Sequence, residues 1–236
     1  MIISHGHRFI FIKTNKTGGT SFELALAKIC APEDIITPVS REDEKTRRAL
    51  GLPGPQNYRL SWHDVGYGRA LAALVTGRAR YDLQYYNHIS AREIRARIGK
   101  DRWNSYFKFC FERNPWDRVV SLYHWKFRHQ GGPRPSLSEF VHSDALQVLK
   151  RRGRGLYTID GEIAVDRICR FENLAGELES LRRQFGIAGP LELPRAKSQH
   201  RRDARAPGDV LTGKDRQRIA EVFREEIELM GYGLEA

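Results

Sequence analysis

The sequence has few cysteines, no long apolar run and no repeated or low-complexity segment. Its three cysteines, Cys30, Cys110 and Cys169, lie far apart, so they predict neither a disulfide framework nor a CxxC metal site. No HxxxH pair or carboxylate cluster has the spacing of metal ligands, and we therefore predict a function that needs no metal. This cysteine usage fits a reducing compartment, so we expect a cytoplasmic protein.

Long hydrophobic segments and acidic charge are both scarce. The apolar run near the start, MIISHGHRFIFIKT, is broken at Lys13 and is too short for a signal-peptide core or a membrane span, which predicts a soluble protein without a transmembrane segment. Lys and Arg number 40 against 29 Asp and Glu, for a formal net charge of +11. This excess predicts an anionic partner, which the charge alone leaves open between a nucleotide, a nucleic acid, an acidic glycan and a membrane surface.

The 236 residues have the composition of a globular protein, with 40% hydrophobic and 29% charged side chains, and we expect one domain over residues 1–236. Short aromatic or β-branched runs, each followed by a loop and a helical pattern, predict three strands at Arg8–Thr14, Tyr106–Glu112 and Ile168–Glu172. Such alternation predicts a three-layer α/β fold with a central, mostly parallel sheet. Ligands of such folds bind at the carboxyl ends of the strands.

Helix boundaries are marked by local signals. Capping boxes begin at Ser90 and Ser136, and they predict helices that end near Gly99 and by Gly153. Further helices are expected over Ser21–Cys30, from Asn114, from Asn173 to Gly186, and from about Thr212 to Met230. Residues 31–68 contain four prolines and are expected to have little regular structure.

The loop after the first predicted strand has the chemistry of a phosphate site and resembles a P-loop. Two glycines allow a sharp turn that brings N–H groups to an anion, hydroxyls add donors, and a lysine adds full charge at a helix N-terminus. The candidate ligands are Lys16, Thr17, Gly18, Gly19, Thr20 and Ser21. The loop is not a Walker A motif, because its lysine precedes the glycines. The alternative is an ordinary glycine turn, which the Lys-Thr pair and the flanking strand and helix disfavour.

The loop after the second predicted strand provides a second anion site. Arg113 leaves the strand beside the N-terminus of the helix that Asn114-Pro115 opens, where it can bind a phosphate with two hydrogen bonds. Ser121 adds a hydroxyl two helical turns later. Taken alone, this loop would equally suit an ion pair of Arg113 with Asp117 or Glu112.

These two loops resemble those of sulfotransferases that use 3′-phosphoadenosine-5′-phosphosulfate (PAPS). KTNKTGGTS is similar to the 5′-phosphosulfate loop of that family, whose common form is PKTGGTS, with Asn15 where proline is usual. Arg113 and Ser121 match the spacing of the family's 3′-phosphate motif. The resemblance also assigns Lys197, Ser198 and Arg201, in a basic loop, to the 3′-phosphate or adenine side, although a solvated basic loop explains them equally well.

The resemblance extends from about His7 to Tyr232 and is strongest to bacterial and carbohydrate sulfotransferases of the heparan-sulfate 2-O type. It implies the sulfotransferase fold, PAPS as co-substrate, 3′,5′-adenosine bisphosphate as product and a hydroxyl acceptor on a carbohydrate or glycan. It also implies a bacterial enzyme that needs no metal. Residues 31–86 and 128–160 are expected to form the acceptor cleft.

Sulfuryl transfer needs a group that takes the acceptor's proton and a cation that stabilises the leaving oxygen. The resemblance assigns the leaving-group role to Lys16 and the base role to His88, in an Asn-His-Ile-Ser segment just before a predicted helix. A histidine base predicts a rate that rises with pH through one ionisation near neutrality. His63, Glu23 and Glu112 are the alternative bases.

Two other classes of protein compete with this interpretation. Both loops could hold a nucleotide of a phosphotransferase, although the sequence lacks a Walker A order and an obvious magnesium carboxylate after a strand. The charge also fits a non-catalytic nucleic-acid-binding domain. However, the aromatic residues of Tyr106–Phe111 alternate as core positions and do not suggest an exposed stacking platform, so we predict no nucleic-acid partner.

Overall fold

The computed structural model describes residues 1–60, 66–77, 84–128, 131–194 and 206–234. Its centre is a five-stranded sheet with the spatial order β3-β1-β2-β4-β7. The strands are β1 (Ile2–Ser4), β2 (Phe9–Ile12), β3 (Ile35–Ile36), β4 (Phe107–Glu112) and β7 (Arg167–Arg170). Strands β2, β4 and β7 run parallel, whereas β1 is antiparallel to β2 and β3. The predicted mixed α/β fold with a mostly parallel sheet is confirmed.

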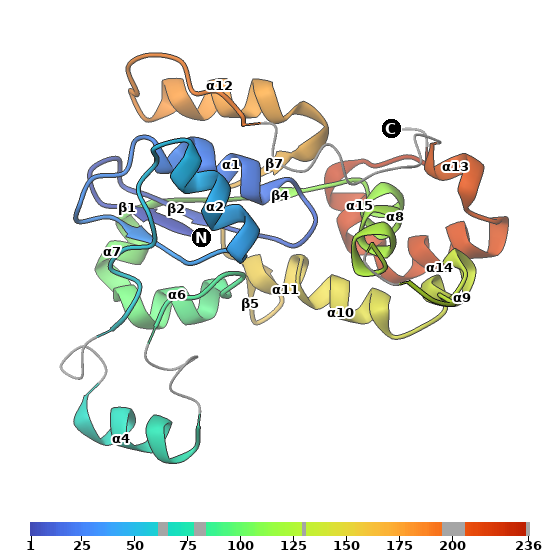
Figure 1. Ribbon diagram of the computed structural model, residues 1–236, viewed down its shortest axis with the longest axis horizontal. Coiled ribbons are helices and arrows are strands. Elements are labelled where there is room, and N and C mark those ends of the chain that lie inside the picture. Colours follow the sequence, from blue (N-terminus) through green and yellow to red (C-terminus); the bar gives the residue numbers. More distant parts are fainter. Residues whose placement is uncertain (61–65, 78–83, 129–130, 195–205, 235–236) are drawn as a thin grey trace.

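Alternation along the strands produces two buried faces. The phenylalanines of β2 and β4 pack with Phe22 of α1 (Gly19–Ala27) and Leu178 and Leu181 of α12 (Leu174–Gln184). Ile10, Ile12 and Cys110 face the other side, where α6 (Ala91–Ile98), α7 (Lys100–Ser105) and α11 (Arg154–Tyr157) cover the sheet. Figure 1 shows these helices above and below the strands. Helices on both faces of the sheet form the expected three layers.

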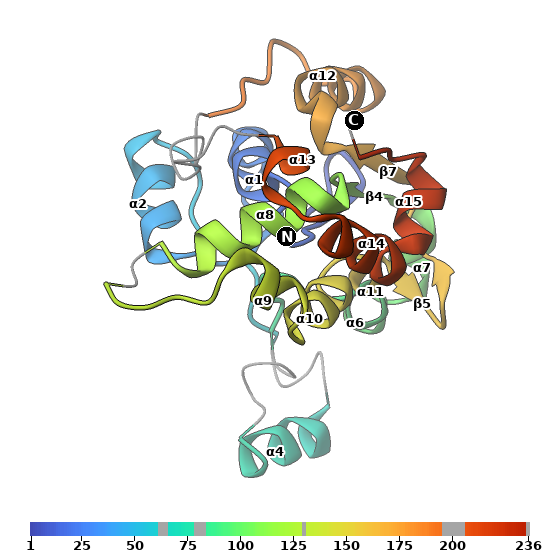
Figure 2. The ribbon, with the colours of Figure 1, turned by 90° about the vertical axis from the view of Figure 1, so that its right-hand side faces the viewer.

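A second group of helices packs beyond the carboxyl ends of the strands. It consists of α8 (Pro115–Lys126), α9 (Leu137–Val141), α10 (Ala145–Arg151), α14 (Gly213–Val222) and α15 (Arg224–Met230). They share one apolar core, and Figure 2, which looks onto this end of the molecule, shows α9, α10 and α14 around α8. The remaining elements are α2 (Arg41–Ala49), α4 (Tyr67–Val75), η1 (Phe171–Asn173), α13 (Pro207–Val210) and the hairpin β5 (Thr158–Ile159) and β6 (Glu162–Ile163).

Several predicted elements have different bounds in the structure. Residues 31–68 contain β3 and α2, so the expectation of little regular structure was wrong there. Helix α2 has the sequence REDEKTRRA, which carries almost no apolar periodicity, and it begins at a Ser40 cap. The helix expected from Ser136 to Gly153 is divided into α9 and α10, and the last one is divided at the buried Phe223. Strand β1 was not predicted.

The capping signals were more reliable than the periodicity. Ser90, Ser136 and Thr212 each form the capping box that begins α6, α9 and α14, and Asn114 caps α8 with proline at its first position. All three cysteines are free thiols. Among the helices that the structure describes, none is long and apolar enough to cross a membrane.

Candidate functional site

The two predicted anion loops leave the sheet side by side. Strands β2 and β4 are parallel neighbours, and Ile12 pairs with Cys110 near their carboxyl ends. The loop of residues 13–18 follows β2, and Arg113 follows β4 directly. The fold therefore brings together two motifs that are almost 100 residues apart in the sequence, since Lys16 and Arg113 are separated by 97 positions.

The N-terminus of α1 is arranged differently from the capped helices. Gly18 is its N-cap in the left-handed conformation, with φ 69°, and the first turn of α1 has neither a side-chain cap nor an acidic residue. By contrast, α6, α9 and α14 place a capping side chain and an acid at the same point. The first N–H groups of a helix have no partner within the helix, and its dipole favours an anion there. This end of α1 suits a phosphate or sulfate group.

The hydroxyls of the loop differ in burial. The Thr17 side chain is buried, and its Oγ1 lies 2.8 Å from Thr14 Oγ1, so this hydroxyl is engaged inside the protein. Thr20 and Ser21 are half-buried on the first turn of α1. Gly19 is close-packed, because a β-carbon there would lie 2.8 Å from Lys13 Cγ. Among the loop's hydroxyls, those of Thr20 and Ser21 are therefore better placed to reach a ligand.

Asn15 fixes the loop through its backbone. Its N–H donates to the Arg152 carbonyl at 2.9 Å, and its carbonyl accepts from Arg118 Nε at 2.9 Å. Arg118 is fully buried and also pairs with Glu112 at 2.9 Å. A proline at position 15 has no N–H to donate. The hydrogen bond from the Asn15 N–H to the Arg152 carbonyl is therefore one that proline, the usual residue at this position of PKTGGTS, could not form.

Arg113 joins the second loop to the first. Its Nε and Nη2 donate to Asp117 Oδ2 at 2.8 and 2.5 Å, so the ion pair considered from the sequence is present. Its Nη1 donates to the Lys16 carbonyl at 3.2 Å. The guanidinium carbon lies 4.1 Å from the centre of the Phe171 ring. Arg113 is thereby held at the point where the two loops meet.

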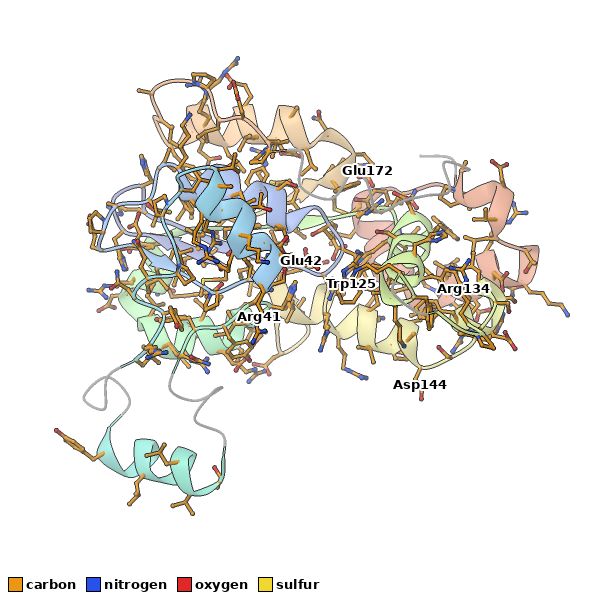
Figure 3. The ribbon with its side chains drawn as sticks, in the orientation of Figure 1. Arg41, Glu42, Trp125, Arg134, Asp144 and Glu172 are labelled. Carbon is orange, nitrogen blue, oxygen red and sulfur yellow. The ribbon has the colours of Figure 1, made fainter. Side chains whose placement is uncertain are left out.

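One face of α8 lines the first loop. Asp117, Ser121 and Trp125 follow one another at intervals of four residues, which places them on the same side of the helix. Asp117 holds Arg113, and the Lys16 ammonium lies 5.3 Å from the centre of the Trp125 ring. Ser121 lies between these two contacts and is half-buried. Figure 3 labels Trp125 where α8 faces the rest of the fold.

His88 also reaches the first loop. Its Nδ1 lies 2.8 Å from the carbonyl oxygen of Lys13, the residue that follows β2. Because a carbonyl only accepts, Nδ1 carries the hydrogen, and in the neutral ring Nε2 is left with the lone pair. Burial of the ring, with the Lys13 charge adding to it, lowers the pKa of His88 to about 3. The imidazole is therefore neutral at pH 7, and the ionisation expected near neutrality is shifted to acid in the ligand-free protein.

Backbone strain coincides with the two candidate catalytic residues. Among the described residues, five other than glycine have a positive φ, and two of them are Lys16 at 64° and His88 at 60°. Left-handed backbone costs a non-glycine residue about 1–2 kcal/mol. Such conformations persist where the surrounding structure holds them, and they cluster at functional sites.

The carboxylate candidates are engaged in buried ion pairs. Glu23 meets Lys13 Nζ at 2.7 Å, the Met1 amine at 3.1 Å and Arg47 at 3.5 Å. Although burial opposes it, the positive charge of Lys13 and the other two cations lowers the pKa of Glu23 to about 2. Glu112 is fully buried against Arg118, and burial raises its pKa. These contacts give both carboxylates structural roles.

The remaining predicted residues cannot be placed. His63 lies outside the described residues, and so do Lys197, Ser198 and Arg201. Within the part of the chain that the structure describes, no group of three His, Cys, Asp or Glu side chains could hold a metal ion.

Sequence reasoning missed two aromatic residues of the site. Trp125 contacts Lys16, and its position four residues after Ser121 was the available signal. Phe171 contacts Arg113 and begins η1 directly after β7, so it lies at the carboxyl edge of the sheet, where ligand sites were expected.

A comparison with models of known protein families matches a region of the chain that contains both of the loops described above and His88. The profile of the sulfotransferase family matches residues 1–147. The chain belongs to the sulfotransferase family. This sulfotransferase is 35% identical, over 107 residues, to an uncharacterized protein of Archaeoglobus fulgidus, an alignment that covers 42% of this chain and 84% of that protein. No solved structure matches it.

Proposed function

We propose that this sulfotransferase moves a sulfuryl group from PAPS to a hydroxyl of a carbohydrate. The observation that carries the proposal is the junction of two anion-binding loops at one edge of the sheet, where Arg113 of the second loop bonds the Lys16 carbonyl of the first. A nucleotide with phosphates at both its 3′ and 5′ positions requires two such sites at a fixed separation. The uncapped N-terminus of α1 suits the 5′-phosphosulfate, and Arg113 with Ser121 suits the 3′-phosphate.

The proposed chemistry uses Lys16 and His88. The acceptor oxygen attacks sulfur, the bond from sulfur to the phosphate oxygen breaks, and the acceptor proton passes to a base. Lys16 neutralises the charge that develops on the leaving oxygen. His88 accepts the proton at Nε2, because its Nδ1–H is directed to the Lys13 carbonyl. The negative charges of bound PAPS would raise the pKa of His88 from its acid value toward the working pH.

The acceptor side of the proposal rests on Trp125. This ring is 38% exposed while it contacts the Lys16 ammonium, so it forms an open wall beside the proposed reacting centre. The guanidinium carbon of Arg128 lies 4.6 Å from the centre of the same ring. An exposed aromatic face with cations around it suits a sugar ring that carries a carboxylate or sulfate. An anionic glycan is the acceptor class that fits this surface best.

The test measures two things, which are the transfer of the sulfuryl group and the class of ligand that stabilises the protein. Labelled PAPS is offered with neutral and anionic glycans, and sulfated products are identified by mass spectrometry. We expect transfer to an anionic glycan, reduced in Trp125→Ala while the affinity for 3′,5′-adenosine bisphosphate is unchanged. A thermal-shift series with that nucleotide, ATP with magnesium, and single-stranded DNA separates the rival classes. Stabilisation by ATP with magnesium or by DNA, and none by the bisphosphate, would contradict the proposal.

The source and location of the enzyme stay predictions from the sequence. The cytoplasmic location was inferred from the cysteine usage, and the bacterial source and the likeness to the heparan-sulfate 2-O type were inferred from the resemblance of the motifs. The structure and the family match do not bear on them.

A further inference from the structure

Phe171 lies at the carboxyl edge of the sheet, beside both anion loops. It is the first residue of η1 and follows β7, the third parallel strand. Its ring centre lies 4.1 Å from the guanidinium carbon of Arg113 in the second loop. Phe171 belongs to neither anion loop and reaches the site from a third segment of the chain.

The same ring packs against the first loop. A β-carbon built on Gly18 would lie 2.8 Å from Phe171 Cε2 and 3.0 Å from Leu174 Cδ1. Gly18 also has a φ of 69°, which a residue with a β-carbon adopts at a cost. The absence of a side chain at position 18 therefore lets the Phe171 ring approach the backbone that begins α1. One aromatic ring contacts both loops.

We propose that Phe171 is a positioning residue that holds the Arg113 guanidinium at a fixed distance from the α1 N-terminus, and thereby makes the donor site select nucleotides with a 3′-phosphate. This inference rests on the proposed function, in which Arg113 binds that phosphate. It adds a residue outside both sequence motifs and gives it a role in specificity.

The reason lies in which part of Arg113 each contact uses. Asp117 and the Lys16 carbonyl take hydrogen bonds at the edge of the guanidinium, in the plane where a phosphate would also bind. An incoming phosphate competes with them for the same N–H groups. The guanidinium carbon lies over the face of the Phe171 ring, and this contact takes none of the N–H groups that bond Asp117 and the Lys16 carbonyl. The stacking contact therefore persists when the phosphate replaces edge contacts, and it keeps Arg113 in place.

The experiment measures the preference for the 3′-phosphate as a ratio. Dissociation constants for 3′,5′-adenosine bisphosphate and 5′-adenosine monophosphate are determined by isothermal titration in the wild type, Phe171→Leu and Phe171→Tyr. We expect Phe171→Leu to reduce the preference by about three- to thirtyfold, the range of a cation–π contact. Phe171→Tyr keeps a ring face and should retain the wild-type preference.

Leu174→Ala is the matched control. Leu174 packs against the same glycine as Phe171, and the short contacts at Gly18 involve both side chains. Its truncation should lower the melting temperature without changing the preference, because a merely structural effect would weaken both nucleotides alike. In a double-mutant cycle, Phe171→Leu should have little further effect on the preference in an Arg113→Ala background.

Each outcome has a distinct meaning. If folded Phe171→Leu keeps the wild-type preference, the proposed role of Phe171 is overturned and the donor assignment stays intact. The same conclusion follows if Leu174→Ala loses as much of the preference as Phe171→Leu does. A wild-type protein without preference for the bisphosphate would overturn the proposed function and this inference with it. If Phe171→Leu does not fold, loss of the preference in Phe171→Tyr would overturn the proposal, and full retention would support it.

Discussion

Glu226 is a buried carboxylate whose replacement should stabilise the protein. Its side chain on α15 is 0% exposed, and neither carboxylate oxygen accepts a hydrogen bond from another of the described residues. Burial, with the nearby Glu112 adding to it, raises the pKa of Glu226 to about 6 from an ordinary value of 4.5. Glu226→Gln removes this charge and keeps the size of the side chain.

The magnitude follows from the pKa difference. Because the pKa of Glu226 is higher in the folded than in the unfolded protein, the fold favours the protonated carboxyl. The contribution of this group to protein stability is fully present below about pH 4.5 and is lost as the pH rises through about 6. The difference of about 1.5 pKa units corresponds to about 2 kcal/mol. Glu226→Gln should therefore raise the free energy of unfolding by about 2 kcal/mol more at pH 8 than at pH 4.

Urea denaturation at both pH values measures this difference, and Glu225→Gln is its control. Glu225 is adjacent but exposed, and the hydrogen bond from Lys150 lowers its pKa. A lowered pKa gives stability that is present at high pH, so the Glu225→Gln effect should have the opposite sign and be small. A Glu226→Gln effect that is the same at both pH values would refute the reasoning.

Three further variants test the donor loop and the chemistry. Asn15→Pro should lower the free energy of unfolding, measured in urea, by about 1–3 kcal/mol, because the hydrogen bond to the Arg152 carbonyl is lost. Asn15→Ala keeps this hydrogen bond and is the control. An Asn15→Pro protein as stable as the wild type would contradict the reasoning. Lys16→Ala should reduce kcat by at least ~10²-fold and weaken the bisphosphate much less, and an active variant would show that the leaving-group site is misplaced. His88→Ala should reduce transfer by ~10²–10⁴-fold with donor affinity retained. Because the pKa of His88 in the enzyme without substrate is about 3, kcat/KM should show no ionisation of His88 between about pH 5 and 8. An ionisation near neutrality that is present in the wild type and absent in His88→Ala would contradict this pKa.

The sequence predicted the features that short segments encode. The capping boxes at Ser90 and Ser136 depend on residues three positions apart, and each begins a helix in the structure. The parallel direction of β2, β4 and β7 was predicted from the repeated strand–loop–helix pattern, which also placed the loop of residues 13–21 and Arg113 at one edge of the sheet.

Features that depend on distant contacts could not be predicted. Helix α2 is almost entirely charged, so the sequence has no apolar periodicity there that would predict a helix. The helix is anchored in part by the buried ion pair of Arg47 with Glu23 of α1, which only the fold brings together. The acid shift of the His88 pKa arises from burial and from Lys13, 75 residues away in sequence. Phe171 could not be linked to Arg113 before the third strand was placed beside the second.

The central claim is that two loops bind one nucleotide that has phosphates at both ends, and isothermal titration tests it most directly. The wild type and Arg113→Ala are titrated with 3′,5′-adenosine bisphosphate and with 5′-adenosine monophosphate. We predict that the wild type binds the bisphosphate more tightly by about tenfold or more, the scale of a charge-assisted hydrogen-bonded contact, and that Arg113→Ala binds the two nucleotides almost equally. Equal affinities in the wild type, or a preference that survives in folded Arg113→Ala, would contradict the account.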